Sequence, residues 1–256
     1  MKSKILLFDV ETAPLLGTAW QTYETNLVWL VKDWYMLGFS WKWLGDSKVH
    51  VLVLPSFKRY KKDPEDDSEL VKCLGELLGE CDVAVAHNGD RFDVRKTNAR
   101  LIINGLDRPM PYKTVDTLKV ARKHFAFTSN KLDDLGDTLG VGRKLKTDKE
   151  LWKACMHGDM KAWRQMARYN KQDVLLLERV YLKLRPWMTN HPAVNVIEKR
   201  PKSCPVCGGE RVHKIAKYEP TKTNRKQYYR CYDCKSMVKS RIPENQQAYQ
   251  KMEYTS

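Results

Sequence analysis

Hydrophobic positions recur along the chain in two spacings, which together predict an ordered series of strands and helices. Uninterrupted apolar runs predict short strands at residues 5–10, 35–44, 49–54 and 82–86. Repeats at helical spacing predict helices over 70–78, 92–103, 129–139 and 160–184, with a short strand or turn and a helix within 114–125. Residues 12–33 follow neither pattern and are expected to form a loop. Strands followed by alternating helices and strands favour an α/β fold, in which helices flank a sheet.

The net charge of the chain indicates which kind of partner it binds. The 256 residues include 46 Lys and Arg against 31 Asp and Glu, a formal net charge of +15, which favours a polyanion such as nucleic acid. The apolar runs are too short to span a membrane, so no membrane partner is expected. The chain enters its first strand within a few residues of Met1, so no secretory leader is expected either. We therefore expect an intracellular, cytoplasmic protein, which would suit the host cell of a virus or mobile element.

Acidic residues stand in three short motifs where regular elements begin or end. One motif ends an apolar strand, so its two carboxylates, two positions apart, point to the same side. A second lies between a strand and a helix, and the third places Tyr and Asp four residues apart on one face of a long helix. Clustered carboxylates repel one another unless a cation joins them, and all-oxygen ligands suit magnesium or manganese. The motifs are Phe8-Asp9-Val10-Glu11, Asn88-Gly89-Asp90-Arg91-Phe92-Asp93 and Tyr169-Asn170-Lys171-Gln172-Asp173.

The spacings alone are unspecific, because the chain repeats them elsewhere. Asp-x-Glu recurs at residues 63–65, 67–69 and 148–150, and Tyr-x-x-x-Asp recurs at 112–116 and 229–233. Those copies stand in polar segments, at helix entries or among cysteines. The order of the three motifs and their places on the expected elements therefore carry the information.

In that order the motifs resemble the DEDD exonucleases of the DnaQ-like, RNase H-fold superfamily, over about residues 4–185. Tyr169, four residues before Asp173, is typical of the DEDDy branch; the sister branch carries a histidine where this chain has Arg168. Residues 114–118 and 129–140 are similar, more loosely, to the proofreading domains of B-family DNA polymerases. The resemblance implies an RNase H-like mixed sheet flanked by helices.

The resemblance also implies roles for individual residues. Asp9, Glu11 and Asp173 would bind one Mg²⁺ or Mn²⁺, and Asp9 with Asp93 would bind a second, as in two-metal phosphodiester hydrolysis. Tyr169 would orient the attacking water. Contacts to the terminal nucleotide are expected from the polar or aromatic residues that accompany the motifs: Thr12, Asn88 and Phe92.

Four of the seven cysteines form two CxxC pairs, Cys204/Cys207 and Cys231/Cys234. Each pair can turn two sulfurs toward one ion, so together they predict a small C-terminal zinc ribbon with one structural Zn²⁺. From residue 196 onward the chain has 14 Lys and Arg against 6 Asp and Glu, with tyrosines interleaved. The ribbon is thus interpreted as a nucleic-acid grip, and docking of a protein partner is the alternative.

These expectations give a domain order and a function. The domains are a DEDDy exonuclease (1–185), a linker (186–202), the zinc ribbon (203–242) and a tail (243–256). The function is a metal-dependent 3′–5′ exonuclease on single-stranded ends, with DNA as the favoured polymer. An exoribonuclease or a structure-directed endonuclease on the same fold remains open, as does an inactive, nucleic-acid-binding adaptor.

Overall fold

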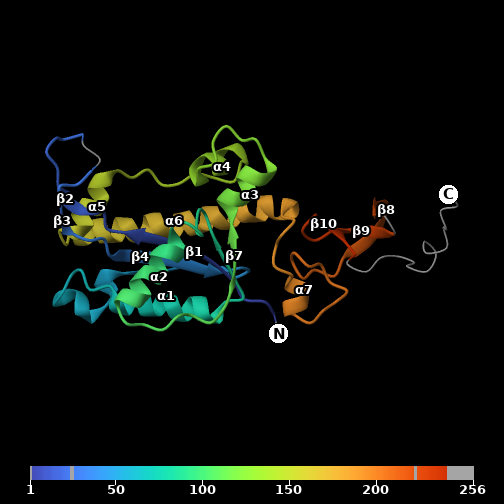
Figure 1. Cartoon of the computed structure of the whole chain (residues 1–256), viewed down its shortest axis with the longest axis horizontal. Helices are drawn as coiled ribbons and strands as arrows, with labels where there is room; N and C mark the ends of the chain where they lie inside the picture. The colour runs from blue at the N-terminus through green and yellow to red at the C-terminus, as the bar shows by residue number, and fades with distance from the viewer. Residues whose placement is uncertain (1, 24–25, 222–223, 241–256) are drawn as a thin grey trace, which may run out of the picture. The chain divides into compact units, whose positions relative to one another are not determined.

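The computed structural model describes residues 2–23, 26–221 and 224–240 (Figure 1). The expected tail, 243–256, and the last two residues of the expected ribbon lie outside the described residues. Two compact units emerge. One is Lys4–Tyr181, and the other joins Met1–Ser3 to the chain from Leu182 onward.

The first unit is built on a five-stranded mixed sheet with the strand order β5-β4-β1-β6-β7. The central strand β1 pairs antiparallel with β4 and parallel with β6, and β7 continues the parallel side. The strands are β1 (Ile5–Thr12), β4 (Met36–Trp43), β5 (His50–Val53), β6 (Val83–Ala86) and β7 (Lys113–Asp116). This mixed sheet confirms the predicted fold class.

Alternation along β1 decides which side chains enter the core. Leu6, Phe8 and Val10 point to one face and join a large buried cluster. Asp9 and Glu11 therefore point to the other face, where they stand opposite Ser40 and Gly38 of β4. The ladder is irregular between Glu11 and Thr12, so the regular strand ends at the acidic motif.

Helices flank the sheet (Figure 1). They are α1 (Ser68–Glu80), α2 (Asp93–Ile103), α3 (Thr117–His124), α4 (Leu132–Thr138), α5 (Lys149–Met156) and α6 (Met160–Leu184), with short 3₁₀ turns η1 (Leu54–Ser56) and η2 (Lys58–Lys61). A further 3₁₀ turn, η3 (Arg185–Trp187), belongs to the second unit. The helix α5 was not expected from the sequence. Within the described residues, no helix is both long enough and apolar enough to cross a bilayer.

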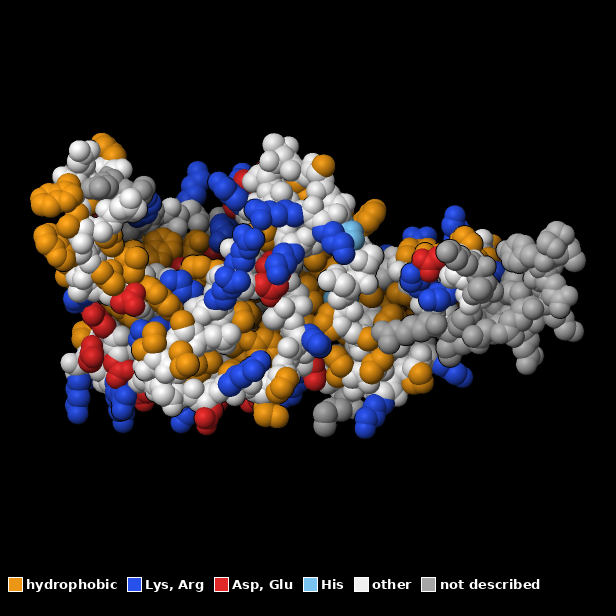
Figure 2. All heavy atoms as spheres, in the orientation of Figure 1, with side chains coloured by type: hydrophobic (Ala, Val, Ile, Leu, Met, Phe, Trp, Pro, Cys, Tyr) orange, Lys and Arg blue, Asp and Glu red, His pale blue; other side chains and the backbone are white. Residues whose placement is uncertain are grey.

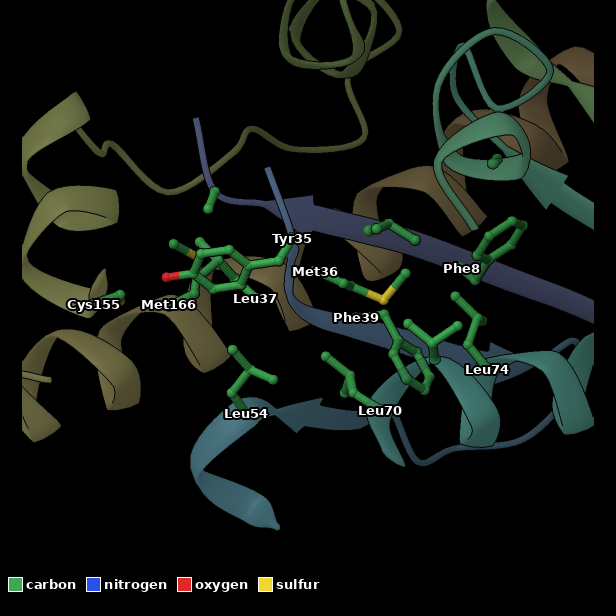
Figure 3. Packing of buried hydrophobic residues seen from close by; sticks show 14 of the residues in the cluster. Phe8, Tyr35, Met36, Leu37, Phe39, Leu54, Leu70, Leu74, Cys155 and Met166 are labelled. Atoms are coloured by element: carbon green, nitrogen blue, oxygen red, sulfur yellow. The ribbon is translucent and has the colours of Figure 1, made fainter. Parts of the chain in front are cut away.

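The core joins strands and helices that are far apart in the sequence. Phe39 of β4, Leu70 and Leu74 of α1 and Met166 of α6 belong to the same buried cluster (Figure 3). Burying each such side chain contributes roughly 1.5–3 kcal/mol. The catalytic candidates on β1 and α6 are thus anchored by apolar neighbours on both sides of each motif.

The segment expected to be a loop, residues 12–33, contains a hairpin instead. Its strands are β2 (Leu16–Thr18) and β3 (Trp29–Lys32), paired antiparallel. Apolar side chains are exposed along it, including Trp20 at 78%, Tyr23 at 96% and Trp29 at 63%. Figure 2 shows such side chains gathered at the end of the first unit where Figure 1 labels β2 and β3. The loop prediction was wrong: residues 27–31 form an uninterrupted apolar run, the pattern of a strand, although β3 has no buried face.

The second unit holds a three-stranded antiparallel sheet with the order β10-β9-β8. Its elements are α7 (Val194–Ile197), β8 (Val212–Pro220), β9 (Arg225–Cys231) and β10 (Met237–Lys239). The small core of this unit consists of the four cysteines with Val206 and their apolar neighbours. So small a core needs a cross-link or a metal to be stable.

Candidate metal centre and active site

Three carboxylates from two elements meet beside the central strand. Asp9 and Glu11 come from β1, and Asp173 comes from α6, four residues after Tyr169. One ligand oxygen from each lies within 4.8 Å of the other two. The end of β1 and one face of α6 thus converge.

A different donor holds each of the three carboxylates. The Asn170 Nδ2 donates to Asp9 Oδ2 at 2.7 Å, and the Trp152 Nε1 donates to Glu11 Oε2 at 3.2 Å. The Lys144 Nζ forms an ion pair with Asp173 Oδ2 at 2.6 Å. Each carboxylate is therefore oriented before any ligand binds.

Asp93 joins this group through the backbone of β1. It is the first residue of α2 and is almost fully buried, and its Oδ1 accepts a hydrogen bond from Val10 N at 2.9 Å. It lies outside the 4.8 Å group of Asp9, Glu11 and Asp173. We call these four residues the acidic centre.

Burial and mutual repulsion raise the pKa values of the acidic centre. Burial is the largest cause for Asp9, whose pKa lies well above its usual value, and the charges of Asp93, Glu11 and Asp173 add to it. The pKa of Glu11 rises to about 8, mainly through burial and then through Asp173, and burial raises that of Asp93 to about 7. Nearby Lys144 opposes these shifts.

The residues present fit a divalent cation. Among the residues that the structure describes, the buried Oδ1 of Asp173 has no hydrogen-bond partner, although its other oxygen is paired with Lys144. A buried carboxylate oxygen left without a partner costs about 1–3 kcal/mol or more, which a cation would offset. All the ligand atoms are oxygens, the set that magnesium and manganese prefer.

Tyr169 lies one helical turn before Asp173. Its ring packs edge-on against Trp152 with ring centroids 5.8 Å apart, and its hydroxyl accepts a hydrogen bond from Lys144 Nζ at 3.3 Å. Burial, followed by the charge of Asp173, raises the pKa of Tyr169 above its usual value. The phenol therefore stays protonated at neutral pH, which suits a hydrogen-bond donor better than a base.

The three residues expected to contact substrate surround this centre less closely. Thr12 ends β1, directly after Glu11. Asn88 adopts a φ of 65°, a conformation that asparagine tolerates better than most residues, and its backbone N donates to Asp116 Oδ1 at 2.9 Å. Phe92 is 37% exposed, with Lys96 Nζ 5.8 Å from its ring centre. Asn88 and Lys144 both line one open cavity of about 670 Å³.

Three residues of the site escaped the sequence analysis. Lys144 belongs to none of the three acidic motifs, and Trp152 lies on the unexpected helix α5. The signals for α5 are Asp148, whose side chain caps the helix at Glu150 N, and the buried pair Leu151 and Cys155, four residues apart. Asn170 stands inside the Tyr-x-x-x-Asp motif, where its amide could have marked it as a partner for a carboxylate.

The four cysteines of the second unit form a compact cluster. All four sulfurs lie within 4.8 Å of one another, and the pairs Cys204–Cys234 and Cys207–Cys231 are separated by 3.8 Å and 3.7 Å. Sulfurs placed about 2.3 Å from a tetrahedral zinc ion would be about 3.8 Å apart. Backbone N–H groups of Val206 and Gly209 donate to Cys204 and Cys207, as thiolate ligands require. The cluster is compatible with a zinc ribbon.

Together, a mixed sheet flanked by helices and an acidic centre at the end of its central strand define a nuclease fold. A family model described as the RNase_H superfamily matches residues 6–185, and the chain belongs to that superfamily.

The comparison with solved structures agrees with this fold. The chain is similar to the family B DNA polymerase of the hyperthermophilic archaeon Pyrobaculum calidifontis, with a TM-score of 0.56 and 16% identity. The match covers 73% of this chain and 25% of the polymerase, so the chain spans about a quarter of that protein. No curated protein sequence matches this chain.

Proposed function

We propose that the protein is a metal-dependent 3′–5′ exonuclease of the DEDDy type that acts on single-stranded ends, with DNA as the favoured polymer. The observation that carries the proposal is the convergence of Asp9, Glu11 and Asp173, whose oxygens lie within 4.8 Å of one another around the unpartnered Asp173 Oδ1. Asp93 and Tyr169 lie beside them, as a DEDDy site requires.

The carboxylates would hold two Mg²⁺ or Mn²⁺ ions. Asp9, Glu11 and Asp173 would bind the first, and Asp9 would share the second with Asp93. Bound in pairs, such ions lower the pKa of water and stabilise the leaving oxygen of a phosphodiester. The donors Asn170 and Trp152 keep the carboxylates turned toward the ions.

Tyr169 would donate its hydroxyl proton in a hydrogen bond that orients the attacking water. Lys144 contacts both Tyr169 and Asp173, so it fixes the phenol and supplies a positive charge beside the scissile phosphate. Its raised pKa, to which Asp173 and Asp9 contribute, keeps it charged throughout the neutral range.

The terminal nucleotide would lie on the side of Asn88. The cavity that Asn88 and Lys144 line has room for a base and sugar, and Thr12 and Phe92 come from the segments next to the carboxylates. We assign these three residues to substrate binding.

The C-terminal cysteine cluster would hold one structural Zn²⁺. With four sulfur ligands no coordination position stays open for catalysis. The proposed division into an exonuclease domain (1–185), a linker (186–202) and a ribbon (203–242) assigns the chemistry to the first unit. The ribbon would grip nucleic acid, and a protein partner is the other candidate.

The test is a time course with Mg²⁺ or Mn²⁺ on single-stranded DNA and RNA of one sequence, labelled at either end. We expect 5′-labelled DNA to shorten stepwise from its 3′ end, with Asp173→Asn as the inactive control. Internal cuts would assign an endonuclease, and shortening of RNA alone an exoribonuclease. Equal activity of Asp173→Asn and the parent would contradict the assignment of the site.

A further inference from the structure

A second open cavity, of about 520 Å³, is lined in part by Tyr169. It is formed by α6 and by the segment that precedes α5. Four of the side chains that line it are cations: Lys146, Lys161, Arg164 and Arg168. We call these four residues the basic pocket.

The cations of the basic pocket are arranged along one stripe of α6. Lys161, Arg164 and Arg168 follow each other at spacings of three and four residues, so they share a helix face. All four cations are exposed, and none has an Asp or Glu within ion-pair distance among the described residues. Between residues 160 and 172 the helix carries no acidic residue at all. Like charges held together without counter-ions favour an anionic ligand.

The basic pocket is linked to the active centre by one side-chain contact. Tyr169 lines the pocket, and Lys144, whose Nζ lies 3.3 Å from the Tyr169 hydroxyl, lines the cavity that contains Asn88. Lys144 also pairs with Asp173, so this contact lies beside the acidic centre. A strand bound in both cavities would pass close to it.

We propose that the basic pocket binds the phosphate backbone of a single-stranded polynucleotide next to the bond that is cut. The proposal rests on the proposed function and deepens it, because it names the residues that would hold the strand next to the bond that is cut. The three cations on α6 occupy two helical turns, about 10 Å, which is enough to contact more than one phosphate.

A binding measurement in an inactive variant tests this proposal independently of catalysis. The background is the inactive Asp173→Asn variant, and the readout is the fluorescence anisotropy of a labelled oligothymidylate over a range of salt concentrations. Arg164→Gln/Arg168→Gln is compared with Arg108→Gln/Lys123→Gln, which removes the same charge from two exposed, unpaired cations outside the cavity.

We expect the basic-pocket variant to bind about tenfold more weakly and the slope of log Kd against log salt to fall by about 1.4, at about 0.7 for each lost phosphate contact. The control should keep the parent slope, and Arg164→Lys/Arg168→Lys should restore most of the affinity. Equal losses in both double variants, or an unchanged slope, would overturn the proposal.

A mononucleotide released by the reaction also carries a phosphate, so it is the other ligand that the basic pocket could bind. If the basic-pocket variant binds the oligomer normally but thymidine 5′-monophosphate more weakly, the pocket takes product and the backbone assignment is wrong. If the parent cuts no nucleic acid but the loss of binding is confined to the basic-pocket variant, the nuclease proposal fails while the phosphate site stands.

Discussion

Burial, followed by the charges of neighbouring carboxylates, disfavours the ionised forms of Asp9, Glu11 and Asp93. Their pKa values are raised, to about 8 for Glu11 and about 7 for Asp93. Only part of this was foreseeable. The order of the motifs and their places on the elements predict that the carboxylates meet, but the cation Lys144 comes from a segment without regular structure, so no periodicity locates it.

The raised pKa values predict how the metal-free protein responds to pH. When a carboxyl group titrates higher in the folded chain than in the unfolded chain, the folded state binds more protons in between, so stability falls as pH rises through that range. Without added Mg²⁺, the Tm should therefore fall between about pH 5 and pH 8 by about 2–4 °C for each kcal/mol lost.

Mg²⁺ should restore more of the Tm at pH 8 than at pH 5, because the bound ion favours the ionised carboxylates. Thermal melts at both pH values, in buffers without chelator so that the cysteine cluster is undisturbed, measure this difference. In Glu11→Gln the fall with pH should be smaller. A Tm of the parent that is independent of Mg²⁺ at pH 8 would contradict the metal assignment.

Loss of the Tyr169 hydroxyl should slow the reaction without stopping it. A protonated phenol that orients water contributes one hydrogen bond, so Tyr169→Phe should lower kcat by about 10²-fold. Asp9→Ala should leave no measurable hydrolysis, because it removes a ligand of both ions. The comparison uses the single-turnover rates of the two variants on labelled single-stranded DNA. Equal rates would mean that Tyr169 does more than orient the attacking water.

The β2–β3 hairpin shows where element prediction failed. Buried strands such as β1 and β6 were recognised because continuous apolar runs report burial on both faces. The apolar run over residues 27–31, which contains most of β3, carries the same signal and was missed; β3 differs from those strands only in that its side chains are exposed throughout. Helix α5 is only eight residues long, and two buried positions are too few to establish a period.

Exposed aromatic side chains on this hairpin should contribute to binding of unpaired bases. Stacking on an aromatic ring contributes about 1–3 kcal/mol per base, so Trp20→Ala or Trp29→Ala should weaken binding of single-stranded DNA by roughly 5–100-fold. Because both rings are exposed, the Tm should stay unchanged. Anisotropy with duplex DNA is the control, and equal weakening on duplex DNA would exclude base stacking.

For the whole molecule, the sequence indicated a large nuclease-like part and a small cysteine-rich part, and the structure has two compact units. The exact division lay beyond sequence reasoning, because it depends on contacts such as those of Ser3 N and Oγ with Glu198 Oε1, both at 3.0 Å. No local periodicity predicts that Ser3 contacts Glu198, which lies 195 positions further along the chain.

Loss of the Zn²⁺ proposed for the cysteine cluster should unfold the second unit while leaving the first folded. The four-cysteine cluster forms most of its core, and structural zinc sites supply folding free energy directly. Cys204→Ser should expose the chain beyond residue 200 to protease, and the Lys4–Tyr181 fragment should persist. Digestion with mass analysis measures this, and Cys73→Ser, in a helix of the first unit, is the control.

Removal of residues 200–256 distinguishes the two roles proposed for the ribbon, binding of nucleic acid and docking of a protein partner. A nucleic-acid grip predicts weaker and less salt-sensitive binding of substrate, with single-turnover cleavage of bound strand unchanged. Substrate affinity equal to that of the full chain would instead favour a protein partner.

The long helix α6 carries Tyr169, Asn170 and Asp173 as well as the stripe of the basic pocket. In an α-helix, each inserted residue rotates everything after it by about 100°. A single alanine added between Asn170 and Asp173 would thus turn the last carboxylate away from Asp9 and Glu11 without changing any residue type. The length of this segment is therefore constrained as strictly as its composition, so natural variation in α6 should consist of substitutions, with insertions and deletions confined to the loops before Met160.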